Sequence, residues 1–285
     1  GKIYLSMMQN MFEKTPYGIP VIGKIEDIKS VTRDEVFKYF KTFYAPNNAF
    51  IVIVGDVKAD EVLKEVEKRF GNIPKNDDLE KQKKEIFKQN GGFDFKGTYD
   101  GRNVKLHGDT KDPIFMLGFK GIKIGPREAY ILDILSSMLG QGDSSFLSEQ
   151  YVLSRKPLLS NVYAANYTLK ESGVFFIGGQ LLKGSSLAQV QKSLYSKIKN
   201  GCQNSLNERQ LQKVKNQYLV SYLSDLDTNQ GIAKFIGDRQ AFYKDYNFYK
   251  KEMDIYESIQ LEEVKKACGK YLDKKDSIFF SIDHL

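Results

Sequence analysis

The sequence has few of the residues that build metal sites or disulfide frameworks. Its 285 residues include only two cysteines, Cys202 and Cys268, and two histidines, His107 and His284. Two cysteines cannot form a disulfide framework, and two histidines cannot close a tetrahedral zinc site without further carboxylate ligands, which the sequence does not single out. We interpret the cysteines as two separate buried thiols, with one disulfide in an oxidising compartment left open as the alternative.

Long apolar runs and blocks of one charge are also missing. No apolar run reaches the length of about 18 residues that a membrane-spanning helix needs. The net charge of +7 comes from 43 basic and 36 acidic residues that are interspersed along the chain. This pattern is typical of a solvated surface and argues against nucleic acid as a partner. The absence of G-x-S-x-G and Walker motifs argues against serine hydrolases and phosphate-loop enzymes.

Hydrophobic periodicity predicts an α+β protein with a mixed or antiparallel sheet and packed helices. Helices are expected at 2–12, from Thr32 to Pro46, and at 59–70, 127–139, 187–198, 208–226, 231–243 and 261–271, with a short one from Ser145. Strands are expected at 50–54, 104–106, 114–119, 159–169, 173–183 and 278–282. The segment Gly140-Gln141-Gly142 follows a helix and lacks a third glycine, so it is interpreted as a tight interhelical turn and not as a dinucleotide loop.

Chain length favours two domains. The stretch KNDDLEKQKKEIFKQN is dense in charges of both signs and is interpreted as a connector, partly helical at most. The predicted organisation is a partial first lobe at 1–74, a charged linker at 75–103 and a second lobe at 104–285.

Two windows of the sequence indicate an internal duplication. SVTRDEVFKYFKTFYAPNNAFIVIVGD begins at Ser30 and SIQLEEVKKACGKYLDKKDSIFFSIDH begins at Ser258, and they align without a gap. Each has the pattern of a capped helix, a polar turn and an apolar strand, and chance resemblance of two such units is the alternative. The second copy ends a whole lobe, so the same offset predicts that the first lobe is incomplete and that about a hundred residues lie upstream of it.

The first of these windows lies in a stretch that resembles a known family. PYGIPVIG, the turn YAPNNA, the strand end VGDV and the segment FGNIP resemble, in order and spacing, the end of the first domain of insulinase/pitrilysin-type zinc peptidases. That family includes the mitochondrial processing peptidase and short bacterial members. SSMLGQGDSSFLSEQ and the two strands after it are similar to the second domain, more loosely.

The resemblance implies tandem related α/β lobes around a chamber, with zinc held in the first lobe by an H-x-x-E-H helix. Neither histidine of this chain has that context, so the zinc motif is expected upstream or on a partner subunit, with no cofactor in this chain. The resemblance also implies a peptide substrate, a homo- or heterodimer with a related subunit, and export to the periplasm.

The family's second lobe carries an arginine followed seven positions later by a tyrosine, which hold the substrate carbonyl. Our alignment places Val152 or Leu153 at the arginine position and Ser160 at the tyrosine position. Arg155 and Tyr163 are eight residues apart and are the candidate substrate-binding pair; a surface arginine and a strand tyrosine are the alternative. No catalytic or metal-binding residue is predicted.

The resulting hypothesis is that this chain is the zinc-free part of a zinc-dependent endopeptidase, forms a wall of its chamber and is inactive alone. The alternative is a non-catalytic partner subunit or peptide-holding scaffold of the same family.

Overall fold

The computed structural model describes residues 1–89, 97 and 99–283. They form two compact units, both discontinuous in sequence. Unit 1 contains the described residues within 1–13, 95–222 and 248–285, and unit 2 those within 14–94 and 223–247. The predicted domains 1–74, 75–103 and 104–285 are contiguous in sequence, whereas each of these units is not, and the predicted boundaries stay a prediction.

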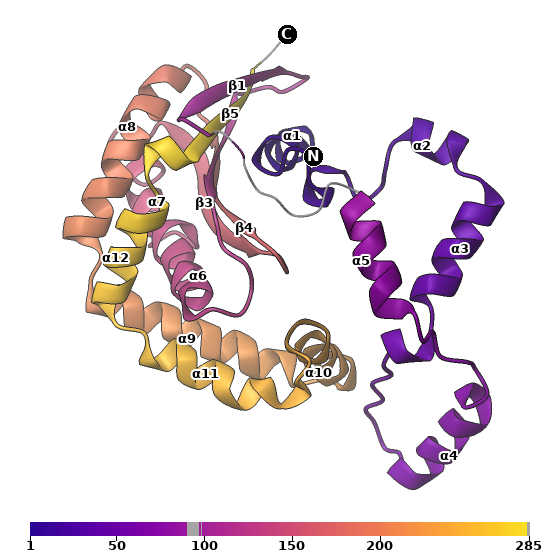
Figure 1. Ribbon diagram of the computed structural model, residues 1–285. Coiled ribbons are helices and arrows are strands. Elements are labelled where there is room, and N and C mark those ends of the chain that lie inside the picture. Colours follow the sequence, from indigo (N-terminus) through magenta and orange to yellow (C-terminus); the bar gives the residue numbers. More distant parts are fainter. Residues whose placement is uncertain (90–96, 98, 284–285) are drawn as a thin grey trace. The chain divides into compact units, whose positions relative to one another are not determined.

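Unit 1 is built on a five-stranded mixed sheet with the strand order β1-β5-β2-β4-β3 (Figure 1). Its strands are β1 (Arg102–His107), β2 (Ile114–Lys120), β3 (Leu159–Thr168), β4 (Gly173–Leu181) and β5 (Ser277–Asp283). Strands β1 and β5 are parallel, and the other neighbours are antiparallel. The predicted α+β fold with a mixed sheet is confirmed.

Helices cover one face of this sheet, and their apolar stripes form the core of unit 1. These helices are α6 (Arg127–Gly140), α7 (Phe146–Tyr151), α8 (Leu187–Asn200) and α12 (Leu261–Tyr271). Their buried side chains pack with Phe115, Leu117 and Phe279 of the sheet, and the rings of Phe115 and Phe279 stack at 5.7 Å. Two further helices, α9 (Glu208–Asp225) and α11 (Tyr249–Ser258), add Val214 and Tyr256 to this core.

Helix α1 (Lys2–Met11) packs on the opposite face of the sheet, against β2 and β5. Met7 and Met11 are buried there, and a Cβ at Gly118 would lie 3.3 Å from both of them, so only glycine leaves them full room. The Tyr99 hydroxyl donates a hydrogen bond to the Met11 carbonyl oxygen (3.1 Å). The apolar stripe of α1 thus belongs to unit 1, whereas the predicted boundaries placed it with residues 1–74.

Cys202 and Cys268 form a disulfide, with their Cα atoms 6.2 Å apart. Cys202 lies in a π-helical turn (Gly201–Ser205) that continues α8, and Cys268 lies on α12. The interpretation as separate thiols is therefore wrong, although both residues are buried as expected. The two positions are 66 residues apart in sequence, and the packing of the π-helical turn against α12 brings them together.

Unit 2 is helical and has few buried residues. Its helices are α2 (Ile25–Ser30), α3 (Arg33–Phe43), α4 (Ala59–Phe70), α5 (Leu79–Gln89) and α10 (Asn229–Tyr243). Helices α2 and α4 have no buried residue among those described, and α3 has only Thr42. The predicted charged linker contains α5 over 11 of its residues, which agrees with the expectation of a partly helical segment.

The strand predicted at 50–54 is wrong for this structure: the segment has no regular secondary structure and pairs with no strand within the described part of the chain. Phe50, Ile51 and Ile53 remain 48%, 56% and 48% exposed. A β-strand is defined by its hydrogen-bonded neighbour, which the described residues of unit 2 do not supply.

The predicted duplication has a structural counterpart. Helices α3 and α12 both have 11 residues, and each is followed by a 3-10 turn, Pro46–Asn48 and Lys274–Asp276. Corresponding bounds are all 228 residues apart. Both helices begin with a reciprocal capping box, Thr32 with Glu35 and Gln260 with Glu263, again at the same offset. The copies differ at their carboxyl ends. In the first copy the segment 50–54 pairs with no strand among the described residues, whereas in the second copy the corresponding strand β5 lies between β1 and β2.

The asparagines of the first copy's turn have a structural role. The Asn47 side chain donates to the Asn76 carbonyl oxygen (2.9 Å) and accepts from the Asn76 backbone N–H (3.0 Å). The Asn76 side chain donates in turn to the Thr42 carbonyl oxygen (3.1 Å). The turn YAPNNA is thus hydrogen-bonded to Asn76, two residues after the segment FGNIP.

Candidate functional site

The predicted pair Arg155 and Tyr163 flanks the start of β3, the end strand of the sheet. Arg155 is exposed in the loop after α7, and the base of this loop is fixed by a backbone hydrogen bond from Leu158 to the Tyr151 carbonyl oxygen (3.0 Å). Among the described residues, no hydrogen bond joins Arg155 to Tyr163. Their joint role in binding stays a prediction.

Tyr163 lies flat against the neighbouring strand β4. Its ring occupies the space where a Cβ on Gly178 would stand, only 2.4 Å from the ring atoms, and it meets the Phe176 ring edge-on at 6.3 Å. Burial raises the pKa of the Tyr163 hydroxyl, so this group stays protonated and able to donate a hydrogen bond at neutral pH. The side chain is still 39% exposed and is therefore accessible to a ligand.

The positions that the resemblance assigns to the arginine and the tyrosine carry other groups. Val152 packs against the core, and Leu153 is 61% exposed. The Ser160 hydroxyl donates to the Gln180 carbonyl oxygen on β4 (3.2 Å). None of these side chains offers the charge of a guanidinium or the reach of a phenol.

Tyr151 at the end of α7 holds the loop that carries Arg155. Its hydroxyl lies 2.8 Å from the Ser193 hydroxyl of α8, and the Lys197 ammonium lies 5.1 Å from its ring centre. Burial raises the pKa of Tyr151 to about 12. This residue therefore stays protonated at neutral pH and anchors α7 to α8.

The turn between α6 and α7 borders a cavity of about 370 Å³, lined by Ser137, Gln141, Gly142, Val214, Gln217, Tyr218 and Ser221. Gly142 has a φ of +78°, and a Cβ on Gly140 would lie 2.3 Å from the Ala164 nitrogen of β3. The glycines therefore serve a tight turn and a close helix–strand approach, and the predicted interhelical turn is confirmed.

Behind this cavity lies a polar cluster around Asp133 on α6. The Asp133 carboxylate accepts hydrogen bonds from the Asn166 side chain (2.8 Å) and from the Tyr256 hydroxyl (2.9 Å). The Tyr256 ring stacks on Tyr218 at 4.6 Å, and the Tyr218 hydroxyl lies 3.2 Å from the Ser137 hydroxyl. The cluster joins α6, β3, α9 and α11.

Burial raises the pKa of Asp133 to about 6, although its two hydrogen bonds oppose the shift. Burial beside this carboxylate also raises the pKa of Tyr218 and of Tyr256. This cluster was not predicted from the sequence, where its one visible sign is a single acidic residue within the largely apolar run AYILDILSSML.

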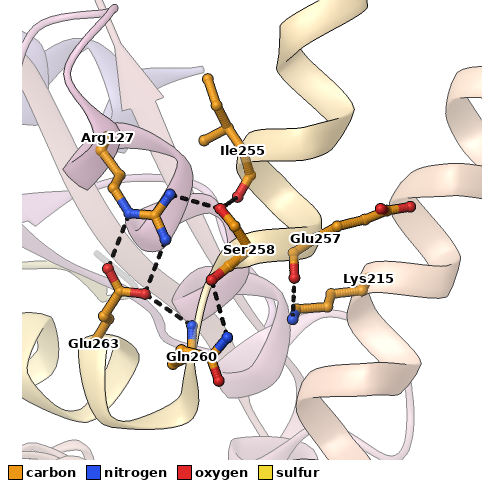
Figure 2. A network of polar contacts seen from close by, with 7 residues as sticks. All are labelled: Arg127, Lys215, Ile255, Glu257, Ser258, Gln260 and Glu263. Carbon is orange, nitrogen blue, oxygen red and sulfur yellow. Dashed lines mark hydrogen bonds and ion pairs between the residues drawn. The ribbon is translucent and has the colours of Figure 1, made fainter.

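A second polar network, shown in Figure 2, fixes the start of α12. The Arg127 guanidinium donates two hydrogen bonds to the Glu263 carboxylate (2.9 and 3.0 Å) and one to the Ser258 hydroxyl (2.7 Å). The Lys215 ammonium donates to the Glu257 carbonyl oxygen (2.7 Å). The hydrogen bonds from Arg127 lower the pKa of the Glu263 carboxyl, and the network holds α12 against α6.

The described residues do not fit a zinc ion. Both cysteines are bonded to each other, His107 lies at the end of β1, and His284 lies outside the described residues. No group of three His, Cys, Asp or Glu side chains with metal-binding geometry occurs in the described ranges. Nor is any helix there both long and apolar enough to cross a bilayer.

Comparison with known proteins places these features in one class, the non-catalytic lobes of zinc peptidases. The family described as "Peptidase M16 inactive domain" matches residues 30–218. The chain is 26% identical over 247 residues to the zinc protease PqqE of Helicobacter pylori, which covers 84% of this chain and 52% of that protein. It is 22% identical to a probable mitochondrial-processing peptidase subunit beta of Arabidopsis thaliana, covering 93% of this chain and 50% of that protein.

Solved structures show the same fold. A protease from Helicobacter pylori superposes with a TM-score of 0.83 at 22% identity, over 99% of this chain and 67% of the other. A peptidase M16 inactive domain from Pseudomonas fluorescens superposes with a TM-score of 0.80 at 17% identity, over 100% of this chain and 65% of the other.

The chain belongs to the Peptidase M16 inactive domain family, which confirms the resemblance to insulinase-type zinc peptidases. It spans about half the length of the two curated relatives named above.

Proposed function

We propose that this chain is the zinc-free portion of a zinc-dependent endopeptidase and forms a wall of the chamber that encloses the peptide substrate. The match of residues 30–218 to an inactive peptidase domain carries this proposal. The named zinc proteases among the relatives support zinc in the whole protein.

The duplication supports a further part of the proposal, in which unit 2 contributes to the zinc-binding lobe. In the second copy, β5 is covered by strands on both sides. Its counterpart at 50–54 is exposed, as are Val36, Phe37 and Phe40 on α3. Exposed apolar side chains in this arrangement indicate a surface that another part of the protein covers. We propose that further strands of the same lobe cover it.

Arg155 and Tyr163 are proposed to contact the peptide at this wall. An exposed guanidinium and a neutral phenol can both donate hydrogen bonds to a peptide carbonyl oxygen. In the whole protein, Arg155→Ala and Tyr163→Phe should raise KM for a peptide more than they lower kcat, because these groups hold the ground state as well as the transition state. Arg209→Ala is the control, since Arg209 lies elsewhere, near the start of α9. An unchanged KM in both variants would remove the pair from the proposal.

A non-catalytic partner subunit is the second candidate. The chain is also 24% identical to a mitochondrial-processing peptidase subunit alpha-2 of Dictyostelium discoideum, a named subunit of a heteromeric enzyme. In that case the whole protein would hold the peptide while a related subunit provides the zinc.

One experiment separates these functions. Zinc content and cleavage of a quenched fluorescent peptide are measured on the 285-residue chain, on the longer natural protein, and on the latter mixed with candidate subunits. Zinc and activity only in the longer protein support the enzyme, and activity only in the mixture supports the partner subunit. Stoichiometric zinc in the 285-residue chain alone would refute both.

Export to the periplasm is part of the proposal, and the Cys202–Cys268 disulfide supports it because disulfides persist in oxidising compartments. Alkylation of the protein directly in lysed cells, followed by mass spectrometry, should find both cysteines blocked from labelling. Fully labelled cysteines would contradict this placement.

A further inference from the structure

A second cavity in unit 1, between the end of α8 and α12, has a composition suited to a ligand. Its volume is about 490 Å³, within the usual range for small-molecule sites. The lining consists of Tyr195, Ile198, Lys199, Cys202, Gln203, Lys265, Cys268, Gly269, Leu272, Asp273 and Lys274. It shares no residue with the smaller cavity beside Tyr218.

The floor of this cavity is apolar and fixed. Ile198, Leu272 and the two cysteines are each less than a tenth exposed. The disulfide ties α8 to α12 across the floor, and the Tyr195 hydroxyl is held 2.9 Å from the Ser277 hydroxyl. The two helices therefore present a preformed surface for an apolar group.

The rim is cationic. Three lysines line it, Lys199, Lys265 and Lys274, against a single acid, Asp273. Asp273 is already engaged, because its carboxylate caps the following 3-10 turn by accepting from the Lys275 backbone N–H (3.0 Å).

The lysine ammonium groups can reach a ligand without loss of a strong interaction. Lys265 lies 3.5 Å from Glu262, whose side chain is 84% exposed, and such surface pairs contribute little. Lys274 lies over the Tyr195 ring at 5.6 Å. In the described part of the chain, Lys199 has no acidic partner within ion-pair distance.

We propose that this cavity binds a small organic carboxylate with an apolar body, whose chain lies on the disulfide floor while its carboxylate meets the lysine rim. Attraction between unlike charges beside a low-dielectric floor is stronger than in open water. Two kinds of molecule have an apolar body next to a carboxylate: a free fatty acid, and a peptide whose carboxyl-terminal residue is apolar. The inference stands independently of the proposed peptidase role.

Calorimetric titration of the 285-residue chain with octanoate and with the uncharged octanamide tests the site. Octanoate should bind with one-to-one stoichiometry, and octanamide about tenfold more weakly or not at all. Lys265→Gln and Lys274→Gln should each weaken octanoate binding about tenfold, while Lys192→Gln, on the outer side of α8, should leave it unchanged. Raising the salt from about 50 mM to about 500 mM should also weaken binding.

A second arm distinguishes the sources. The tripeptide Gly-Gly-Phe is titrated with a free and with an amidated carboxyl terminus. Binding of the free acid alone assigns the site to peptide carboxyl termini, and binding of octanoate without either tripeptide assigns it to fatty carboxylates. Equal affinity for octanoate and octanamide, an unchanged affinity in both lysine variants, or no saturable binding of any probe would overturn the proposal.

Discussion

Asp133 is a largely buried carboxylic acid of α6 whose pKa is raised by folding. It accepts hydrogen bonds from Asn166 and Tyr256, yet burial outweighs them and raises its pKa from 3.8 to about 6. The cluster around Asp133 therefore joins α6, β3, α9 and α11. Above about pH 6 the carboxylate carries a charge that is shielded from water, which lowers the free energy of unfolding.

The pH dependence of stability follows from this shift. The folded state holds a proton on Asp133 between about pH 4 and pH 6 whereas the unfolded chain has lost it, so the free energy of unfolding should fall as pH rises through this window. The decrease is on the order of 3 kcal/mol at most, and it should level off above about pH 7. Urea unfolding at a series of pH values measures it.

The matched variants are Asp133→Asn and Asp254→Asn. Asparagine at 133 keeps an acceptor for the Tyr256 hydroxyl but cannot ionise, so this part of the pH dependence should disappear. Asp254 is exposed on α11, and its replacement should leave the profile as it is. A profile that stays the same in Asp133→Asn would show that other groups cause it.

At the scale of elements, the two capped helices α3 and α12 form an internal comparison. Both begin with a capping box, but only Glu263 of α12 also receives the Arg127 guanidinium. The same local motif thus has an additional long-range contact in the second copy. Removing the glutamate of the capping box should therefore lower the free energy of unfolding more at α12 than at α3.

Glu263→Gln should destabilise unit 1 by about 1 kcal/mol, a value reduced because the ion pair is partly exposed. Glu35→Gln removes the charge of the equivalent residue, but glutamine keeps an oxygen that can accept from the Thr32 backbone N–H, and no ion pair is lost among the described residues, so its effect should be smaller. Because Arg127 lowers the pKa of Glu263, the contribution of this pair is present above about pH 4.5 and is lost on acidification. Chemical unfolding at pH 7 and at pH 3 checks the ranking; equal effects of the two substitutions at pH 7 would contradict it.

The disulfide between the π turn and α12 is a second contact that acts on whole elements. It closes a separation of 66 residues, and loss of such a crosslink typically costs about 2–5 kcal/mol. Reduction should therefore lower the Tm of the chain, whereas a Cys202→Ala/Cys268→Ala double variant should melt at the lower temperature with or without reductant. A Tm that reductant does not change, in protein shown by alkylation to be reduced, would argue against a stabilising role.

How far the sequence predicts these elements depends on where their partners lie. The bounds of α12 and β5 follow from local capping and apolar periodicity, and the structure confirms the expected helix at 261–271. The pairing of Cys202 with Cys268 and the hydrogen bonds to Asp133 depend on residues far apart in the chain, for which a single sequence has no local signal. The segment 50–54 has the apolar, β-branched composition of a strand, and its pattern therefore predicted one. No neighbouring strand pairs with it among the described residues, so the strand does not form.

At the scale of the molecule, the two units differ in how much they bury. Unit 1 has one continuous core that includes four buried residues of α12, whereas the equivalent helix α3 of unit 2 buries only Thr42 among the residues described. Since packing of an apolar face supplies most helix stability in proteins, the two copies of one motif should differ in their local free energy of opening.

Hydrogen exchange followed by mass spectrometry tests this difference in the 285-residue chain. Amides of α3 and of α4 should exchange at least about a hundredfold faster than those of α12, although α3 and α12 have the same length and the same type of cap. In the proposed whole protein, the protection of α3 and of residues 50–54 should rise toward that of α12 and β5, because additional strands would bury the apolar side chains that are exposed here. Equal protection of α3 and α12 in the shorter chain would show that unit 2 is stable without such a partner, and would remove the main physical reason for assigning it to a larger lobe.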